Sequence, residues 1–301
     1  MNVLPFFSVV IPSYNCADLL KRALESVFSQ TYTDYEIIVI DNSSTDNTQG
    51  VLKSFDNNKL NIIEVSNSGI IAYSRNKGIE NAKGEWIAFL DSDDVWQSNK
   101  LEKVYNTIIN NPEIILVCHN EWHMINNERK NPLTYGPAGQ DLYKRLLFKG
   151  NCLSTSAVCL KKDIALESNG FSERKDFITV EDYEYWIRLA QKGDFFFINE
   201  KLGEWHTHGE NYSDNALVHA NALIAVKEHH FDNFINKNPD LLKAVNKGRA
   251  KSLSSAANTL RKGKYYDQAI KYSKNGILNA PMYWKNWVII LLSIIEKYFK
   301  V

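Results

Sequence analysis

Three carboxylates follow a single apolar run in this chain. Residues 86–90 (WIAFL) have the composition of a buried strand, and Asp91, Asp93 and Asp94 come directly after it. Carboxylates this close repel one another, and a protein that gathers them usually neutralises them with a hard divalent cation bound through oxygen. Open α/β folds bind ligands where strands end, so the cluster predicts a metal and ligand site there. The alternative is a solvated acidic turn that also caps the next helix.

Short β-branched runs alternate with helical periodicity from residue 6 to about residue 120. Helices are expected around Leu19–Phe28 and, with a less regular pattern, around Ile70–Gly78. The alternation predicts repeated βα units on a mostly parallel sheet, so the ends of successive strands meet at one edge. The expected strands are residues 9–11, 37–40, 62–65, 87–90 and 114–117.

Short polar side chains precede the first two expected helices and predict their N-caps, because such side chains accept hydrogen bonds from the first helical amides. Asn15 or Asp18 is expected to cap the first helix. Ser43 or Ser44 is expected to cap the second.

The pattern changes beyond residue 120. Residues 126–139 are rich in Asn, Pro and Gly and predict a loop, residues 154–160 predict a strand, and residues 180–191 predict a helix. From residue 214 the pattern is almost entirely helical. Residues 263–281 resemble half of one tetratricopeptide repeat, which predicts a helical hairpin because one copy makes no solenoid. We expect a first domain over 1–213, with halves at about 1–120 and 121–213, and a helical region over 214–301.

Composition narrows the class of protein. The 301 residues and a hydrophobic share of 44% fit a folded domain with an appendage, and Lys plus Arg equal Asp plus Glu at 35 each. No overall charge therefore favours nucleic acid as a partner. Cys16, Cys118, Cys152 and Cys159 form no close pair, which predicts reduced thiols in a cytoplasmic setting, with a Cys152–Cys159 bond as the alternative. The start of the chain lacks the pattern of a secretory signal.

Four segments together resemble the family 2 glycosyltransferases with a GT-A fold. They are residues 10–15 (VIPSYN), 40–46 (IDNSSTD), 67–69 with 74–79 (NSG and SRNKGI), and 89–94 (FLDSDD). The resemblance covers about residues 6–215. It implies an α/β, GT-A type nucleotide-sugar-binding fold with a mostly parallel central sheet, followed by a helical C-terminal appendage. It also implies an inverting transferase whose metal ligands include the D-x-D pair Asp91 and Asp93.

The same resemblance assigns a donor site. Tyr14 can stack on a base, and Asp41 and Asn42 can bond to its edge. The family more often has a second Asp in place of Asn42, so uracil is the expected base and another pyrimidine is the alternative. Arg75 offers donors to a diphosphate or to the acids nearby, unless it is a surface arginine. The expected nucleotide-sugar contacts are Pro12, Tyr14, Asn15, Asp41, Asn42, Asn67, Arg75, Asp91 and Ser92.

Residues 180–186 (VEDYEYW) match the family's ED-x-x-x-W segment. The resemblance implies that Asp182 is the general base, which takes the proton of the acceptor hydroxyl as that hydroxyl attacks the anomeric carbon. Glu181 and Trp186 are expected on the acceptor side. The alternatives are stabilisation of the helix dipole by the two acids and a core position for Trp186.

Residues 205–213 (WHTHGENYS) resemble the family's aromatic-Arg-x-His segment. His208 falls on the family histidine, which implies a ligand of the metal or a contact with the diphosphate. His206 stands where an arginine is common, so the source of positive charge there is open. A zinc site made by His206 and His208 is the alternative.

The sequence therefore predicts a hexosyltransferase that uses a UDP-sugar and Mn²⁺ or Mg²⁺. Its acceptor is a hydroxyl of a glycan or of a polyprenyl-linked saccharide, in bacterial surface polysaccharide synthesis. One alternative is a nucleotidyltransferase, although residues 12–16 lack the glycines of a phosphate loop. The other is a non-catalytic carbohydrate-binding or scaffolding protein.

The C-terminal segment, residues 283–300, predicts where the protein works. Its apolar run is shorter than the ~20 residues that span a membrane, but aromatic residues and lysines flank it. This pattern predicts a peripheral contact with the inner face of the membrane. The alternatives are a helix buried against its neighbours and a contact between copies in a homo-oligomer.

Overall fold

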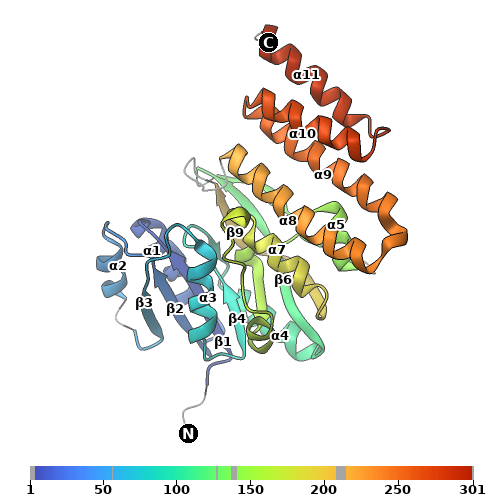
Figure 1. Ribbon diagram of the computed structural model, residues 1–301. Helices are drawn as coiled ribbons and strands as arrows, with labels where there is room; N and C mark the ends of the chain where they lie inside the picture. The colour runs from blue at the N-terminus through green and yellow to red at the C-terminus, as the bar shows by residue number, and fades with distance from the viewer. Residues whose placement is uncertain (1–3, 56, 127, 137–140, 208–214, 300–301) are drawn as a thin grey trace. The chain divides into compact units, whose positions relative to one another are not determined.

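The computed structural model describes residues 4–55, 57–126, 128–136, 141–207 and 215–299 (Figure 1). The chain divides into two compact units. The first comprises Met1–Leu146, Gly150–Glu173 and Tyr185–Gly209, and the second comprises Leu147–Lys149, Arg174–Glu184 and Glu210–Val301. The division passes through α5 (Leu142–Lys149) and α7 (Glu181–Leu189). The domain boundary expected at residues 213 and 214 stays a prediction.

A single mixed sheet forms the centre of the first unit. The strand order is β3-β2-β1-β4-β8-β6-β9-β5, with β7 paired to β6. β3, β2, β1 and β4 are parallel, whereas β8 is antiparallel to both β4 and β6. The predicted parallel order is therefore confirmed for β3, β2, β1 and β4. The strands are β1 (Phe7–Ser13), β2 (Tyr35–Asp41), β3 (Leu60–Glu64), β4 (Trp86–Phe89), β5 (Val95–Trp96), β6 (Ile114–Ile125), β7 (Glu128–Leu133), β8 (Val158–Lys161) and β9 (Asp194–Thr207).

Alternate residues of β1 and β2 face two different helical layers, as the period of two in a strand requires. The odd-numbered apolar residues of both strands pack with α1 (Ala17–Phe28) and α4 (Lys100–Asn110). On the other face, Val10 and Ile40 lie against α3 (Ile71–Asn81), where a Cβ on Gly78 would be only 2.2 Å from Val10 Cγ1. Both faces are therefore buried, which explains the continuous β-branched runs.

Asp46 holds the N-termini of two helices. Its Oδ2 accepts a hydrogen bond from the Ala17 amide (3.0 Å), and its Oδ1 accepts one from the amide of Thr48, the first residue of α2 (Thr48–Ser54; 3.0 Å). Desolvation raises the pKa of Asp46, but these bonds outweigh it and leave that pKa below its ordinary value. The predicted caps, Asn15 or Asp18 for the first helix and Ser43 or Ser44 for the second, are wrong. One carboxylate serves both helices, from two residues before α2 and 29 residues away from α1.

Three other expectations need correction. The loop predicted over residues 126–139 contains β7, which pairs with β6. The strand predicted over 154–160 begins with a 3₁₀ turn, η1 (Thr155–Ala157), before β8. The four cysteines are free, so the alternative of a Cys152–Cys159 bond is wrong. The long strand β9 had no counterpart among the expected strands.

The remaining short helices are α6 (Lys162–Glu167) and η2 (Lys175–Phe177). The second unit continues with α8 (Ala216–Lys237), η4 (Pro239–Leu241), α9 (Leu242–Lys262), α10 (Tyr266–Asn279) and α11 (Lys285–Phe299). A small cluster of Ala220, Ala256, Leu260 and Ala269 joins α8, α9 and α10. None of the helices in the described residues is long and apolar enough to cross a membrane.

Candidate functional site

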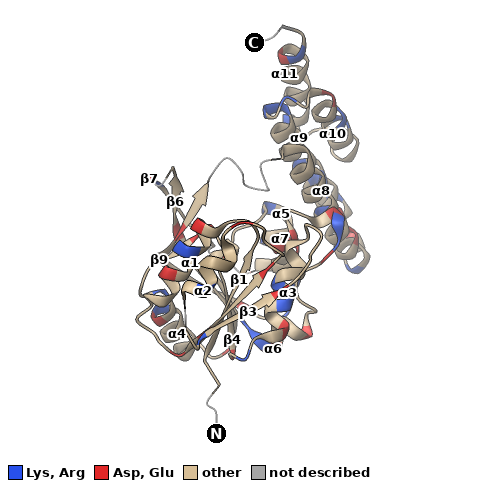
Figure 2. Ribbon diagram, turned by 90° about the vertical axis from the view of Figure 1, so that its left-hand side faces the viewer, with Lys and Arg blue, Asp and Glu red and all other residues tan. Residues whose placement is uncertain are grey.

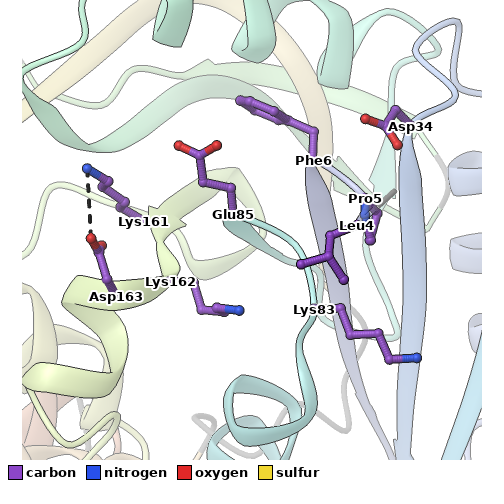
Figure 3. Close-up of a pocket in the computed structure, with 9 residues that line it drawn as sticks. All are labelled: Leu4, Pro5, Phe6, Asp34, Lys83, Glu85, Lys161, Lys162 and Asp163. Carbon is purple, nitrogen blue, oxygen red and sulfur yellow. Dashed lines mark ion pairs between the residues drawn. The ribbon is translucent and has the colours of Figure 1, made fainter. Parts of the chain in front are cut away.

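The carboxyl ends of the parallel strands carry the polar residues that the sequence singles out. Ser13 and Asp41 are opposite each other at the ends of β1 and β2, and Asp91 comes soon after β4. The opposite edge, where these strands begin, has a pocket of about 550 Å³ (Figure 3). Phe6 and Glu85, which directly precede β1 and β4, line that pocket. The candidate site is at the carboxyl edge, where such folds bind ligands.

The loops after β1 and β2 fix each other. The Asn15 amide donates to Ser44 Oγ (2.9 Å), and Asn15 Oδ1 accepts from the Thr45 amide (2.7 Å). Asp41 is buried, and its two oxygens accept from Ser44 Oγ (2.5 Å) and Gln49 Nε2 (2.8 Å). Each carboxylate oxygen can accept a further bond, so contact between Asp41 and a base stays a prediction. The Asn15 side chain shapes this loop pair.

Asn42 presents a donor at this edge. Its Oδ1 accepts from the Asn67 amide (2.7 Å), and Asn67 in turn donates from Nδ2 to Ser74 Oγ at the start of α3 (2.9 Å). With the oxygen of Asn42 used in this way, the Nδ2 donor is the group that this side chain offers to a ligand. Tyr14 is 59% exposed at the end of β1, as a ring that stacks on a base must be. Contact of Asn42 and Tyr14 with a base stays a prediction.

Arg75 is a buried residue that faces the acidic cluster. It is 4% exposed, its Nη2 donates to Asp91 Oδ1 (2.7 Å), and its guanidinium lies 5.3 Å from the ring centroid of Phe171. The alternative of a surface arginine is therefore wrong. A charge-assisted hydrogen bond of this kind neutralises one of the clustered carboxylates while leaving Asp91 partly accessible, at 29% exposure.

Asp94 is buried, unlike Asp91 and Asp93, and it joins three segments. Ser156 Oγ donates to Asp94 Oδ2 (2.5 Å) and accepts from the Asp91 amide (3.0 Å). The His206 amide on β9 donates to Asp94 Oδ1 (2.9 Å). Burial, and then the charges of Asp93, Glu121 and Asp91, raise the pKa of Asp94 well above its ordinary value. Asp94 thus ties the acidic turn to η1 and to the end of β9.

Glu121 on β6 is a second buried acid, which the sequence argument missed. It is fully buried, accepts a hydrogen bond from the Tyr135 hydroxyl (2.9 Å), and lies so near β9 that a Cβ on Gly203 would be 3.1 Å from Oε1. Burial raises its pKa to about 7, although hydrogen bonds from Ser154 and Tyr135 oppose that rise. The sequence signal that could have identified Glu121 is a lone carboxylate that follows the apolar residues of β6.

Arg22 supplies positive charge beside His206. Its Nη2 lies 3.0 and 3.1 Å from the two ring nitrogens, and His206 Nε2 is 3.4 Å from Glu204 Oε2. A hydrogen bond from the guanidinium occupies one ring nitrogen at a time, so the alternative of a zinc site made by His206 and His208 stays untested. The residues that the structure describes contain no group of three His, Cys, Asp or Glu placed to hold a metal ion. His208 lies outside those residues.

The acids that begin α7 belong to the second unit. Glu181 is buried, and the partly exposed Asp182 accepts from the Tyr183 amide through Oδ1 (2.6 Å). Thr179, just before them, has a φ of 79°, which is strained for a β-branched residue. Such strain persists only where the surroundings impose it, and it often marks functional segments.

Trp186 is a core residue of the first unit. Its side chain is fully buried, stacks on Tyr185 at 5.5 Å between centroids, and meets the edge of Phe171 at 5.8 Å. A sugar packs only on an exposed aromatic face, so the expected acceptor-side role of Trp186 is wrong. The core alternative accounts for the residue.

The model of one protein family, described as Glycosyl transferase family 2, matches residues 8–164, which is more than half of the chain. The chain belongs to this family. It is therefore a glycosyltransferase, as the four sequence segments predict. A relative from Escherichia coli, named UDP-Glc:alpha-D-GlcNAc-diphosphoundecaprenol beta-1,3-glucosyltransferase WfgD, is 30% identical over 192 residues, which are 64% of this chain and 72% of that enzyme.

Two solved structures have the same fold. TarS 1-349 of S. aureus, in complex with UDP-GlcNAc, aligns with a TM-score of 0.63 at 14% identity over 98% of this glycosyltransferase and 91% of the 1-349 fragment. The mannosyltransferase PcManGT from Pyrobaculum calidifontis, in complex with GDP-Man and Mn²⁺, aligns with a TM-score of 0.58 at 15% identity. The alignment covers 99% of this chain and 88% of the PcManGT chain. The GT-A type fold expected from the sequence is confirmed.

Glu121 predicts a pH dependence of stability. Because its pKa rises from 4.5 to about 7 on folding, its protonated form contributes stability that is complete below pH 4.5 and is lost as pH rises through 7. We expect the free energy of unfolding of the wild type to fall across this window by on the order of 3 kcal/mol relative to Glu121→Gln. Urea titrations between pH 4.5 and 8 measure the difference. The exposed Glu113→Gln is the control, and identical pH profiles for the wild type and Glu121→Gln would contradict the prediction.

Proposed function

We propose that this glycosyltransferase moves a sugar, with inversion, from a UDP-sugar to a hydroxyl of a glycan or polyprenyl-linked saccharide in bacterial surface polysaccharide synthesis. The observation that carries the proposal is the arrangement at one sheet edge of the exposed Tyr14, the Asn42 donor and the Arg75–Asp91 pair. An aromatic ring can stack on a base, an amide can bond to the edge of that base, and a guanidinium can bind a diphosphate. The substrates named for WfgD and the UDP-GlcNAc complex of TarS support the choice of donor.

The acids after β4 fit a divalent cation. Asp91 has a second carboxylate oxygen beyond the one that Arg75 binds, Asp93 follows two residues later in the same turn, and Asp94 bonds to the buried Ser156. Asp91 and Asp93 are the residues that would hold Mn²⁺ or Mg²⁺, with His208 as a further ligand. When bound, the cation would offset the charge of the donor diphosphate. The Mn²⁺ in the complex of PcManGT supports this assignment.

Asp182 is the proposed base. Asp182 is partly exposed, so an acceptor hydroxyl can come within hydrogen-bond reach of its carboxylate and transfer its proton there. Glu181, which is buried beside it, is assigned to orienting the acceptor side. We also propose that the enzyme acts in the cytoplasm at the inner face of the membrane, where a polyprenyl-linked acceptor is accessible.

The base specificity tests the donor assignment. We expect UDP to inhibit transfer or to raise the melting temperature more than GDP or ADP does, because Asn42 donates to a base carbonyl and Tyr14 stacks on the ring. Tyr14→Ala is expected to weaken UDP binding by roughly tenfold, which corresponds to the loss of one stacking contact. Titrations with all three nucleotides provide the measurement. Since PcManGT is known with GDP-Man, a preference for GDP would redirect the donor assignment to guanine.

Removal of the proposed metal ligand is expected to abolish transfer. Asp93→Ala takes away one of the two carboxylates that would bind the cation, and chelator is expected to have the same effect on the wild type. Product formation from a panel of UDP-sugars measures both, and thermal unfolding checks that the fold is intact. Asp34→Ala, at the opposite sheet edge, is the matched control. Full turnover by Asp93→Ala or in the presence of chelator would overturn the metal assignment.

Asp182→Asn is expected to separate binding from chemistry. The amide cannot take the acceptor proton, so transfer is expected to fall by roughly a hundredfold or more while UDP affinity is retained. Steady-state rates at saturating donor and UDP titrations give the two quantities. Asp240→Asn, an exposed carboxylate in the same unit, controls for the loss of charge. A variant that loses UDP affinity but keeps its rate at saturating donor would place Asp182 in the donor site instead.

A further inference from the structure

The last helix of the second unit turns its apolar side chains to solvent. Trp287 is 55% exposed and Leu291 59%, whereas Asn286 and Ser293 are fully buried. At ~100° per residue, the exposed apolar positions fall within an arc of roughly 160°, so they form one stripe. We call this stripe the outer face of α11. Its residues are Trp287, Val288, Leu291, Leu292, Ile294 and Tyr298 of the helix, with Trp284 directly before it.

The inner face of α11 is fixed by packing. Asn286 Nδ2 donates to the carbonyl oxygen of Ala250 on α9 (3.3 Å), and a Cβ added to Gly276 on α10 would lie 2.3 Å from the same nitrogen. Ile289 is buried on this side as well. A rotation of the helix that buried the outer face would break this fit, so the exposure of the stripe is a consequence of how the unit packs.

The same part of the chain carries a strong positive charge. Residues 242–301 contain twelve Lys and Arg against two Asp and Glu, a net charge of +10, so the rest of this neutral chain has −10. The two acids are paired, Glu296 with Arg261 and Asp267 with Lys297. Figure 2 shows blue segments along α8 to α11. Eight exposed lysines form no ion pair with any described residue: Lys243, Lys247, Lys251, Lys262, Lys264, Lys271, Lys274 and Lys285.

From these two features we infer that the outer face of α11 binds an anionic lipid surface, with its aromatic and aliphatic side chains in the interfacial layer. An apolar stripe with aromatic residues gains by leaving water for acyl chains and headgroups, and a basic surface is attracted to anionic headgroups. A second copy of the chain would bring two units of like charge together. The inference specifies the lipid contact behind the proposed location, and it rests on the proposed function only for the choice of a membrane-bound acceptor.

Vesicle sedimentation with the full-length protein tests the inference. We expect the protein to sediment with phosphatidylcholine vesicles that contain phosphatidylglycerol and much less with phosphatidylcholine alone. Binding is expected to weaken as NaCl rises from about 0.1 to 0.5 M, since salt screens the headgroup charge. Trp287→Gln with Leu291→Gln is expected to lower the partition coefficient by at least about tenfold. Ser255→Gln with Thr259→Gln, at exposed positions of α9, is the matched control.

Several results would overturn the inference. These are failure of the wild type to sediment, equal binding to neutral and anionic vesicles, and unchanged binding by the Trp287 and Leu291 variant. Light scattering adds another: self-association of the wild type that the same variant abolishes would assign the face to a second copy. UDP affinity is measured for every protein in parallel. Vesicle binding without UDP binding would leave the surface in place and overturn the proposed donor, so the two failures are distinguishable.

Discussion

The neutralisation of three neighbouring carboxylates is the constraint on which the candidate site depends. Asp91 is held by the guanidinium of Arg75, which is itself buried against Phe171. Asp94 is taken out of solvent, where Ser156 and the His206 amide bond to it and burial favours its protonated form. With Asp91 and Asp94 held by α3, η1 and β9, the acidic turn stays folded while Asp91 remains 29% exposed at the edge of the sheet.

The sequence predicted what depends on local pattern. The continuous apolar runs of β1, β2 and β4 predicted buried strands, and the polar residues that follow them could be assigned to one sheet edge from the parallel order alone. The GT-A type fold and the transferase class followed from the same segments. Glu121 was missed because the expected strand ended at residue 117, whereas β6 continues to Ile125 through polar residues that lack an apolar pattern.

Contacts between distant residues could not be predicted in the same way. Asp46 caps α1 from 29 residues away, and Arg22 meets His206 across 184 residues, so neither pairing leaves a trace in the neighbouring sequence. The burial of Trp186 was equally hidden, because an aromatic residue on an amphipathic helix has the same pattern whether it faces a core or a sugar. These cases share one cause. The local sequence allows several arrangements of similar free energy, and contacts with distant parts of the chain determine which of them forms.

The net charge of the whole chain also fails to predict how charge is distributed between its parts. A net charge of zero excludes an overall attraction to polyanions, but it is the sum of a segment with +10 and a remainder with −10. Attraction to a charged surface falls off within about a Debye length, ~8–10 Å at physiological salt, so a lipid headgroup responds to the unit nearest to it and not to the sum. The exposed apolar stripe of α11 lies on the basic segment. Attraction and insertion therefore act on the same part of the chain, while the acidic turn after β4, which would bind a cation, belongs to the part with negative charge.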